Sequence, residues 1–242
     1  MFFYLYDEFV RDKKNETVIR GIENRIIELG INGRVERLQP LRNLKEIITV
    51  GLKQKVHTFV VVGSDATLLH AINILADEKV ALGFIPLGQN SSRLGELFGI
   101  HDALEACNAL SRRITKPVPL AKANQTHFLT ELSFPAPVGT VLHFDNGFSI
   151  TSITDCHVKV SPQPPVCCVT IQPDTITKRP LWGSPPPPLT PTTLTTQRLT
   201  VEPPEKLIEA LLDYTTTIKA PLTITLKAKP LKVIVGKDRG LI

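Results

Sequence analysis

The stretch that decides the fold is FVVVGSDATLLHAINIL, residues 59–75. It begins with four apolar residues, Phe59 to Val62, and such a run without polar alternation is typical of a strand buried on both faces of a parallel sheet. Apolar residues then recur at helical spacing from Leu68 to Leu75. The polar residues 63–67 therefore form a turn between a strand and a helix. In α/β proteins this kind of turn lies at a ligand-binding edge of the sheet, where backbone amides favour anions.

The same unit then repeats. Residues 80–86, VALGFIP, read as a second buried strand, and residues 88–92, GQNSS, form a second polar turn after it. The carboxyl ends of parallel strands share one edge of the sheet, so the two turns are expected to lie side by side. Together they can hold one phosphate chain between them.

The residues before this stretch predict more of the same sheet. Phe2 to Tyr6 and Val35 to Leu38 read as strands, and residues 12–29 and 41–52 have helical periodicity. This order of strands and helices predicts a doubly wound parallel sheet with right-handed crossovers. A further helix is expected at residues 102–110, and we place the end of this first domain at residue 115.

From residue 116 onward the chain consists of short segments rich in threonine and valine, which predict a second, mostly antiparallel β-sandwich domain over residues 116–242. Asp145-Asn146-Gly147 is a strong hairpin signal within it. Polyproline at residues 179–196 predicts an extended loop, because proline cannot donate to a sheet ladder. A helix is expected at residues 205–212, followed by strands at 222–226 and 231–235.

Composition bounds the function. The chain has 242 residues, of which 42% are hydrophobic and 21% charged, values typical of a globular protein. The net charge of +5 is spread along the chain, which favours a solvated surface over attraction to nucleotides or to an anionic membrane. The basic stripe or aromatic platform of a nucleic-acid-binding module is not seen, so we expect no nucleic-acid partner.

Further patterns concern location and metals. No apolar run approaches the length of about 20 residues that crosses a bilayer, and the first eight residues, MFFYLYDE, do not read as a signal peptide. We therefore expect a cytoplasmic protein without a transmembrane segment. The spacing of the cysteines predicts no zinc site and favours buried thiols in a reducing compartment; they are Cys107, Cys156, Cys167 and Cys168.

The two polar turns resemble the hallmarks of the diacylglycerol kinase and related lipid kinase catalytic domain. The family pattern G-G-D-G-T stands here as Gly63-Ser64-Asp65-Ala66-Thr67, and I-P-x-G-T-x-N stands as residues 85–92, IPLGQNSS. Two of the family's glycines are replaced by Ser64 and Ala66. The segment 113–124 is similar to the family's crossing strand and keeps Asn124. The resemblance covers almost the whole chain, and its specific part is the pair of turns.

The resemblance implies binding of ATP and magnesium. It places Asp65 in the catalytic centre, near the γ-phosphate and its magnesium ion, which makes Asp65 the candidate metal ligand. The residues it assigns to the nucleotide are Gly63, Ser64, Asp65, Ala66, Thr67, Gly88, Gln89, Asn90 and Ser91. From the residues alone, Asp65 can equally be the cap of the following helix, and one residue can serve both roles.

The chain departs from the family in two further places. The asparagine-proline turn after the first strand is replaced by residues 6–9, YDEF, which bring negative charge near the expected phosphate position. The late aspartate-glycine-glutamate turn is represented by residues 212–215, LDYT, where Asp213 is a second candidate catalytic acid.

Three functions follow from the resemblance and its departures. The first is ATP- and magnesium-dependent phosphorylation of a lipid hydroxyl at the membrane surface. The second is a catalytically eroded relative that acts as a nucleotide- or lipid-binding sensor or scaffold, and the third is an NAD-kinase-like enzyme. The sequence leaves open whether the protein is active, which lipid accepts the phosphate, and what oligomer it forms.

Overall fold

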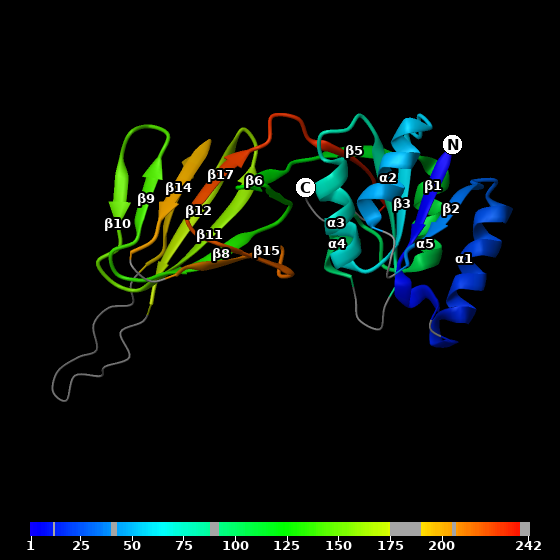
Figure 1. Ribbon diagram of the computed structural model, residues 1–242, viewed down its shortest axis with the longest axis horizontal. Helices are drawn as coiled ribbons and strands as arrows, with labels where there is room; N and C mark the ends of the chain where they lie inside the picture. Colours follow the sequence, from blue (N-terminus) through cyan, green and yellow to red (C-terminus); the bar gives the residue numbers. More distant parts are fainter. Residues whose placement is uncertain (12, 40–42, 88–91, 175–189, 205–206, 238–242) are drawn as a thin grey trace. The chain divides into compact units, whose positions relative to one another are not determined.

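The computed structural model describes residues 1–242 except 12, 40–42, 88–91, 175–189, 205–206 and 238–242 (Figure 1). The chain divides into two compact units. The first consists of Met1–Val118 together with Pro230–Ile242, and the second is Pro119–Lys229. Each unit has its own sheets and is described separately below.

The first unit is built on one six-stranded sheet of order β2-β1-β3-β4-β18-β5. Neighbouring strands run parallel throughout, apart from β5, which is antiparallel to β18. The strands are β1 Phe2–Tyr6, β2 Gly33–Arg37, β3 Thr58–Gly63, β4 Ala81–Pro86, β5 Thr115–Val118 and β18 Leu231–Ile234. The expected doubly wound parallel sheet is thus confirmed.

Helices cover both faces of this sheet. They are α1 Glu16–Glu28, α2 Leu44–Lys53, α3 Asp65–Leu75, α4 Arg93–Leu97 and α5 Ala103–Arg112, with 3-10 turns η1 Glu8–Arg11 and η2 Lys13–Asn15 before α1. On one face the rings of Phe3 and Phe59 pack beside Gly51 of α2. On the other, the hydroxyl of Tyr4 donates to the Ile31 carbonyl at 2.6 Å, just after α1. Successive residues of β1 therefore serve opposite layers.

The second unit is a sandwich of two six-stranded sheets, as expected. One sheet has the order β10-β9-β14-β17-β6-β7 and the other β13-β12-β11-β8-β15-β16. The first contains β6 Ala121–Ala123, β7 Thr126–Phe128, β9 Val141–Phe144, β10 Ser149–Thr151, β14 Arg198–Glu202 and β17 Leu222–Leu226. The second contains β8 Leu132–Ala136, β11 Cys156–Gln163, β12 Val166–Pro173, β13 Thr192–Thr196, β15 Glu209–Leu212 and β16 Thr216–Lys219.

The boundary of the second unit differs from the expected 116–242. The sandwich ends at Lys229, and the strand at 231–234 returns to the first sheet as β18. There it lies between β4 and β5, where Leu231, Val233 and Ile234 are buried. Burial of these apolar side chains between two strands of the first sheet accounts for the return.

The prediction of a helix at residues 205–212 is wrong, because residues 207–212, which the structure describes, contain no helix. Glu209–Leu212 is the strand β15, in which Ala210 and Leu212 are buried and Glu209 and Leu211 are exposed. This alternation has the period of a strand, and pairing with β8 and β16 fixes it. Residues 205 and 206 lie outside the described part.

An extended loop was expected over residues 179–196, but the last five residues of this segment form a strand. Thr192–Thr196 is the strand β13, which pairs with β12. No proline follows Pro191 in this segment, so its amides can join the ladder. Residues 175–189, which include the polyproline, lie outside the described residues.

Among the described residues, no helix combines the length and apolar character that crossing a bilayer requires. The longest described helix, α1, has 13 residues.

Candidate functional site

A serine between β3 and α3 caps the amino end of the helix. Ser64 precedes the helix with φ −87° and ψ 164°, and its hydroxyl oxygen accepts a hydrogen bond from the Thr67 amide at 3.3 Å. Ser64, which replaces a glycine of the family pattern, is therefore the helix cap. Asp65 is the first helical residue, so the interpretation of Asp65 as the cap is wrong.

A second acidic residue reaches this turn from the end of β1. The Asp7 carboxylate oxygen Oδ2 accepts hydrogen bonds from the Ser64 hydroxyl at 3.2 Å, from the Ser64 amide at 3.5 Å and from the Thr67 hydroxyl. Its other oxygen accepts from the Glu8 amide at 2.6 Å. The carboxylate thus lies at the amino end of α3, where the helix dipole stabilises negative charge.

Gly63 makes room for this carboxylate. A Cβ atom at Gly63 would lie 2.7 Å from the Cβ atom of Asp7 and 2.9 Å from its Oδ2 atom, so any larger residue would displace Asp7. The Gly63 carbonyl also accepts a hydrogen bond from the Leu87 amide at 2.9 Å, which links the turn to the end of β4. The glycine here serves close packing within the protein.

Asp65 is tied to the next helix. Its Oδ1 atom accepts a hydrogen bond from the Ser92 hydroxyl at 2.5 Å, and its Oδ2 atom lies 3.4 Å from the Leu94 amide. Ser92 also caps α4 by accepting from the Gly95 amide at 2.7 Å. The half-buried Asp65 carboxylate is therefore held between the amino ends of two helices at the carboxyl edge of the sheet.

The predicted site is thus assembled in part. Gly63 ends β3, Ser64 links it to α3, and Asp65, the exposed Ala66 and Thr67 form the first turn of that helix. Gly88, Gln89, Asn90 and Ser91 lie outside the described residues. Sequence reasoning missed two participants, Asp7 as acceptor and Ser92 as donor. The acidic pair directly after the first strand was the available signal for Asp7, and for Ser92 it was its place in the second polar turn, which was expected to lie beside the first.

Asp213, the second candidate acid, lies in the sandwich unit. It is 6% exposed, at the turn between β15 and β16. Its carboxylate accepts hydrogen bonds from the amides of Leu129 at 2.8 Å, Thr130 at 2.7 Å and Glu131 at 3.2 Å, and from the Thr130 hydroxyl at 2.7 Å. These bonds give it a structural role that holds the loop after β7, and its catalytic role stays a prediction.

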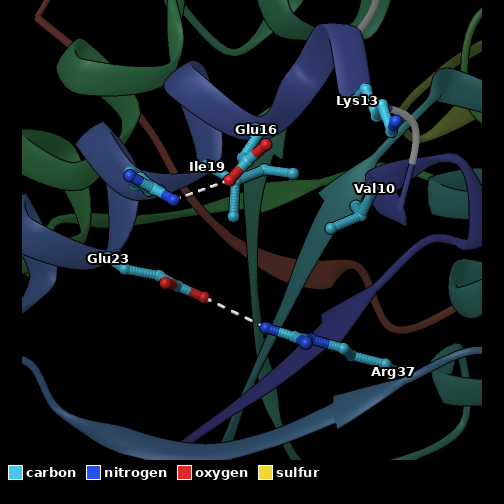
Figure 2. Close-up of a pocket in the computed structure, with 7 residues that line it drawn as sticks. Val10, Lys13, Glu16, Ile19, Glu23 and Arg37 are labelled. Carbon is cyan, nitrogen blue, oxygen red and sulfur yellow. Dashed lines mark hydrogen bonds and ion pairs between the residues drawn. The ribbon is translucent and has the colours of Figure 1, made fainter.

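A hollow of about 260 Å³ opens elsewhere on the first unit, beside α1 (Figure 2). Val10 and Ile19 supply apolar lining, and five charged side chains surround it: Lys13, Glu16, Arg20, Glu23 and Arg37. Four of these are paired, Arg20 with Glu16 at 2.6 Å and Arg37 with Glu23 at 3.3 Å. The pair of Arg37 and Glu23 is visible in Figure 2. Because the carboxylates neutralise both arginines, the hollow is a weaker anion site than its basic residues suggest.

Burial was expected for all four cysteines and is confirmed for three of them. Cys107, Cys156 and Cys167 are buried, and Cys168 is half-buried. Burial raises the pKa of the Cys107 and Cys167 thiols to about 11, which keeps them protonated at neutral pH.

The residues of this site fit magnesium and phosphate, the groups that the resemblance implies, to different degrees. In the described part of the chain, no three histidine, cysteine or acidic side chains gather as a metal site. Magnesium needs fewer protein ligands, commonly one or two carboxylates with water and phosphate, and the oriented Asp65 carboxylate fits that need. A phosphate group fits the amino end of α3 only where Asp7 releases the hydroxyl and amide donors.

The fold is shared with known proteins. A diacylglycerol kinase from Bacillus anthracis strain Sterne superposes with a TM-score of 0.75 at 17% sequence identity, covering 97% of this chain and 96% of that one. Two putative diacylglycerol kinases from the same strain superpose with TM-scores of 0.73 and 0.74, at 16% and 14% identity. They cover 97% and 99% of this chain, and 97% and 98% of their own.

Sequence comparison adds nothing to this likeness: no family model and no curated protein matches the chain. Since the identities are low, the likeness to the solved structures establishes the two-unit fold and leaves the chemistry to the site itself.

Proposed function

We propose that this protein is a divergent lipid kinase of the diacylglycerol kinase type, which transfers the γ-phosphate of ATP to a lipid hydroxyl with magnesium. The fold is common to this chain and to a diacylglycerol kinase over nearly the full length of both. Fold alone does not carry an activity, so the proposal depends on the site.

The observation that carries the proposal is the position of Asp65. Its carboxylate lies at the carboxyl edge of a parallel sheet, where such sheets bind ligands, and the Ser92 hydroxyl at 2.5 Å fixes its direction. A carboxylate oriented before the ligand arrives can hold a metal ion without the cost of reordering a free side chain.

Each residue of the turn then has a role. When bound, magnesium and ATP supply the phosphoryl group and neutralise its charge. Asp65 would hold the metal, and Ser92 keeps its carboxylate in place. Where Asp7 releases them, the Ser64 and Thr67 hydroxyls would orient phosphate oxygens at the amino end of α3. The acceptor is a lipid at the cytoplasmic membrane surface. A role of Asp213, in the second unit, as a catalytic acid stays a prediction.

The second candidate function is a catalytically eroded nucleotide or lipid sensor. The contacts of Asp7 favour it, because a carboxylate already accepts from the Ser64 and Thr67 hydroxyls. Such a protein would keep the fold and bind a ligand without transferring phosphate.

Transfer of radiolabelled phosphate from Mg-ATP to extracted lipid tests the proposal. We expect the wild type to label lipid and Asp65→Asn to label it about 100-fold more slowly or worse, a loss typical for a catalytic charge. The matched control is Glu46→Gln, an exposed carboxyl-to-amide change on α2 of the same unit, which should leave the rate unchanged. Absence of label transfer by the wild type contradicts the kinase. Stabilisation by Mg-ATP without transfer supports the sensor.

A further inference from the structure

The hydrogen-bond donors at the amino end of α3 are already engaged by the protein itself. One oxygen of Asp7 accepts from the Ser64 amide, the Ser64 hydroxyl and the Thr67 hydroxyl. Amide and hydroxyl donors at a helix start are the groups that bind phosphate oxygens in many proteins. A carboxylate oxygen is an anionic acceptor of the same kind, so Asp7 and a phosphate group compete for one set of donors.

The position of Asp7 is fixed by the sheet. Its amide donates to the Val62 carbonyl at 2.9 Å, and the preceding residue, Tyr6, pairs with Val62 in the parallel ladder of β1 and β3. On the other side, the Leu38 amide donates to the Tyr6 carbonyl at 2.8 Å. Since the backbone is held by both neighbouring strands, the carboxylate is aimed at the turn by the rigid part of the unit.

The close approach of Asp7 to the turn is part of the packing around Gly63. The space that a Cβ atom would need at Gly63 is filled by Asp7, at 2.7 Å from its Cβ atom. Gly63 therefore leaves room for the Asp7 carboxylate.

We infer that Asp7 determines the specificity of the turn: its carboxylate stands in for a phosphate oxygen, so that metal-free phosphate ligands are rejected and ATP is accepted only with magnesium. The inference rests on the proposed function for the place where the phosphates bind. The physical reason is charge. A free triphosphate must approach the negative charge of Asp7, whereas a bound magnesium ion neutralises part of the repulsion.

Calorimetric titration with ATP, in EDTA and in excess magnesium, tests the inference. We expect the wild type to bind ATP in magnesium and at least about tenfold more weakly in EDTA, the effect of one close like charge. Asp7→Asn keeps the size of the side chain and removes its charge. It should bind metal-free ATP at least about tenfold more tightly than the wild type.

Glu8→Gln is the matched control. It removes one negative charge at the next residue, from an exposed side chain in η1, and should leave both affinities unchanged. Asp7→Ser, a second uncharged variant, serves the same test if Asp7→Asn does not fold, as judged by its melting curve.

Three results would overturn the inference. One is an Asp7→Asn affinity for metal-free ATP equal to that of the wild type, and another is an equal gain in Glu8→Gln. The third is the absence of ATP binding by wild type and variant under both conditions. Calorimetry measures binding and needs no phosphate transfer. If the wild type fails to label lipid, the kinase proposal is contradicted, but a higher affinity of Asp7→Asn for metal-free ATP still supports the inference about Asp7.

Discussion

The two turns that carry the candidate acids use their carboxylates differently. In the sandwich unit, the buried Asp213 accepts four hydrogen bonds, three of them from consecutive amides of another loop. In the α/β unit, the half-buried Asp65 accepts one short bond from Ser92 and a longer one from Leu94. The resemblance to the lipid kinase family made both residues candidates for the same chemistry.

The difference teaches that the surroundings of a carboxylate decide its role. A carboxylate has about four acceptor positions, and those of Asp213 are matched by four donors, of which the Leu129 amide is buried and the others are partly buried. Asp65 keeps acceptor capacity for a ligand or a metal. The contacts of Asp213 therefore stabilise its turn, whereas ligand binding at the Asp65 turn is what we propose.

The largest effect is expected from Asp213→Ala. The substitution leaves the amides of Leu129, Thr130 and Glu131 without their acceptor, and it places alanine at a φ of +45°. We expect a loss of roughly 3 kcal/mol or more in the free energy of unfolding, which corresponds to a fall in melting temperature of roughly 10 °C. Thermal unfolding followed by circular dichroism measures it.

Glu209→Ala, an exposed change on β15 of the same hairpin, is the control and should stay within about 0.5 kcal/mol. Asp213→Asn, which retains one acceptor oxygen and tolerates positive φ, should fall between the two. If Asp213→Ala melted like the wild type, the four hydrogen bonds would contribute nothing to stability, and the contrast between the Asp213 and Asp65 turns would disappear.

A smaller loss is expected from Gly63→Ala, which tests the packing of the other turn. The new methyl group would meet Asp7 at 2.7 Å, and overpacking of this kind costs about 1–3 kcal/mol. Asp7→Gly in the same chain should recover most of that loss, because it removes the clashing atoms. A double-mutant cycle with chemical denaturation measures the coupling.

Gly21→Ala in α1 supplies the matched control, since nothing lies within 4 Å of its added Cβ atom. It should stabilise the chain by up to about 1 kcal/mol through helix propensity. If Gly63→Ala behaved in the same way, the close approach of Asp7 to the turn would be refuted.

The smallest effect is expected from Asp145→Asn, which concerns an exposed carboxylate of the sandwich. Hydrogen bonds from the Thr196 hydroxyl at 2.7 Å and the Gln197 amide at 2.9 Å lower the pKa of Asp145. Because the folded pKa lies below the unfolded one, its stabilisation is present above about pH 4 and is lost as the pH falls through the folded value.

We therefore expect Asp145→Asn to melt slightly below the wild type at neutral pH and to converge with it in acid. Melting temperatures between about pH 2 and pH 7 measure the difference. A constant difference across that range would show that the charge of Asp145 is not what the two donors stabilise.

Local patterns predicted much of the fold. The apolar runs at 2–6, 59–62 and 80–86 became β1, β3 and β4, because fully buried parallel strands need no polar alternation. The turn signal at Asp145 to Gly147 became the hairpin of β9 and β10, with Gly147 at a φ of +86°. In both cases the signal depends on residues close in sequence.

The failures involve distant partners. The strand β15 was expected to be a helix because apolar residues at 208–212 fit either period, and only pairing with β8 and β16 decides between them. The strand β18 looked like the end of the sandwich, yet its neighbours are β4 and β5 of the first sheet. Strand composition does not say which sheet a strand joins.

The sequence by itself determined that a buried strand gives way to a helix across Gly63 to Thr67, and that Asp65 lies near the start of that helix. It also placed acidic residues directly after the first strand. Only the tertiary structure decided that Asp7 binds Ser64, 57 residues away, and that Asp213 binds the Leu129 amide, 84 residues away. The physical reason is that a hydrogen bond needs its two atoms within about 3 Å, and strand order and register bring such distant residues together.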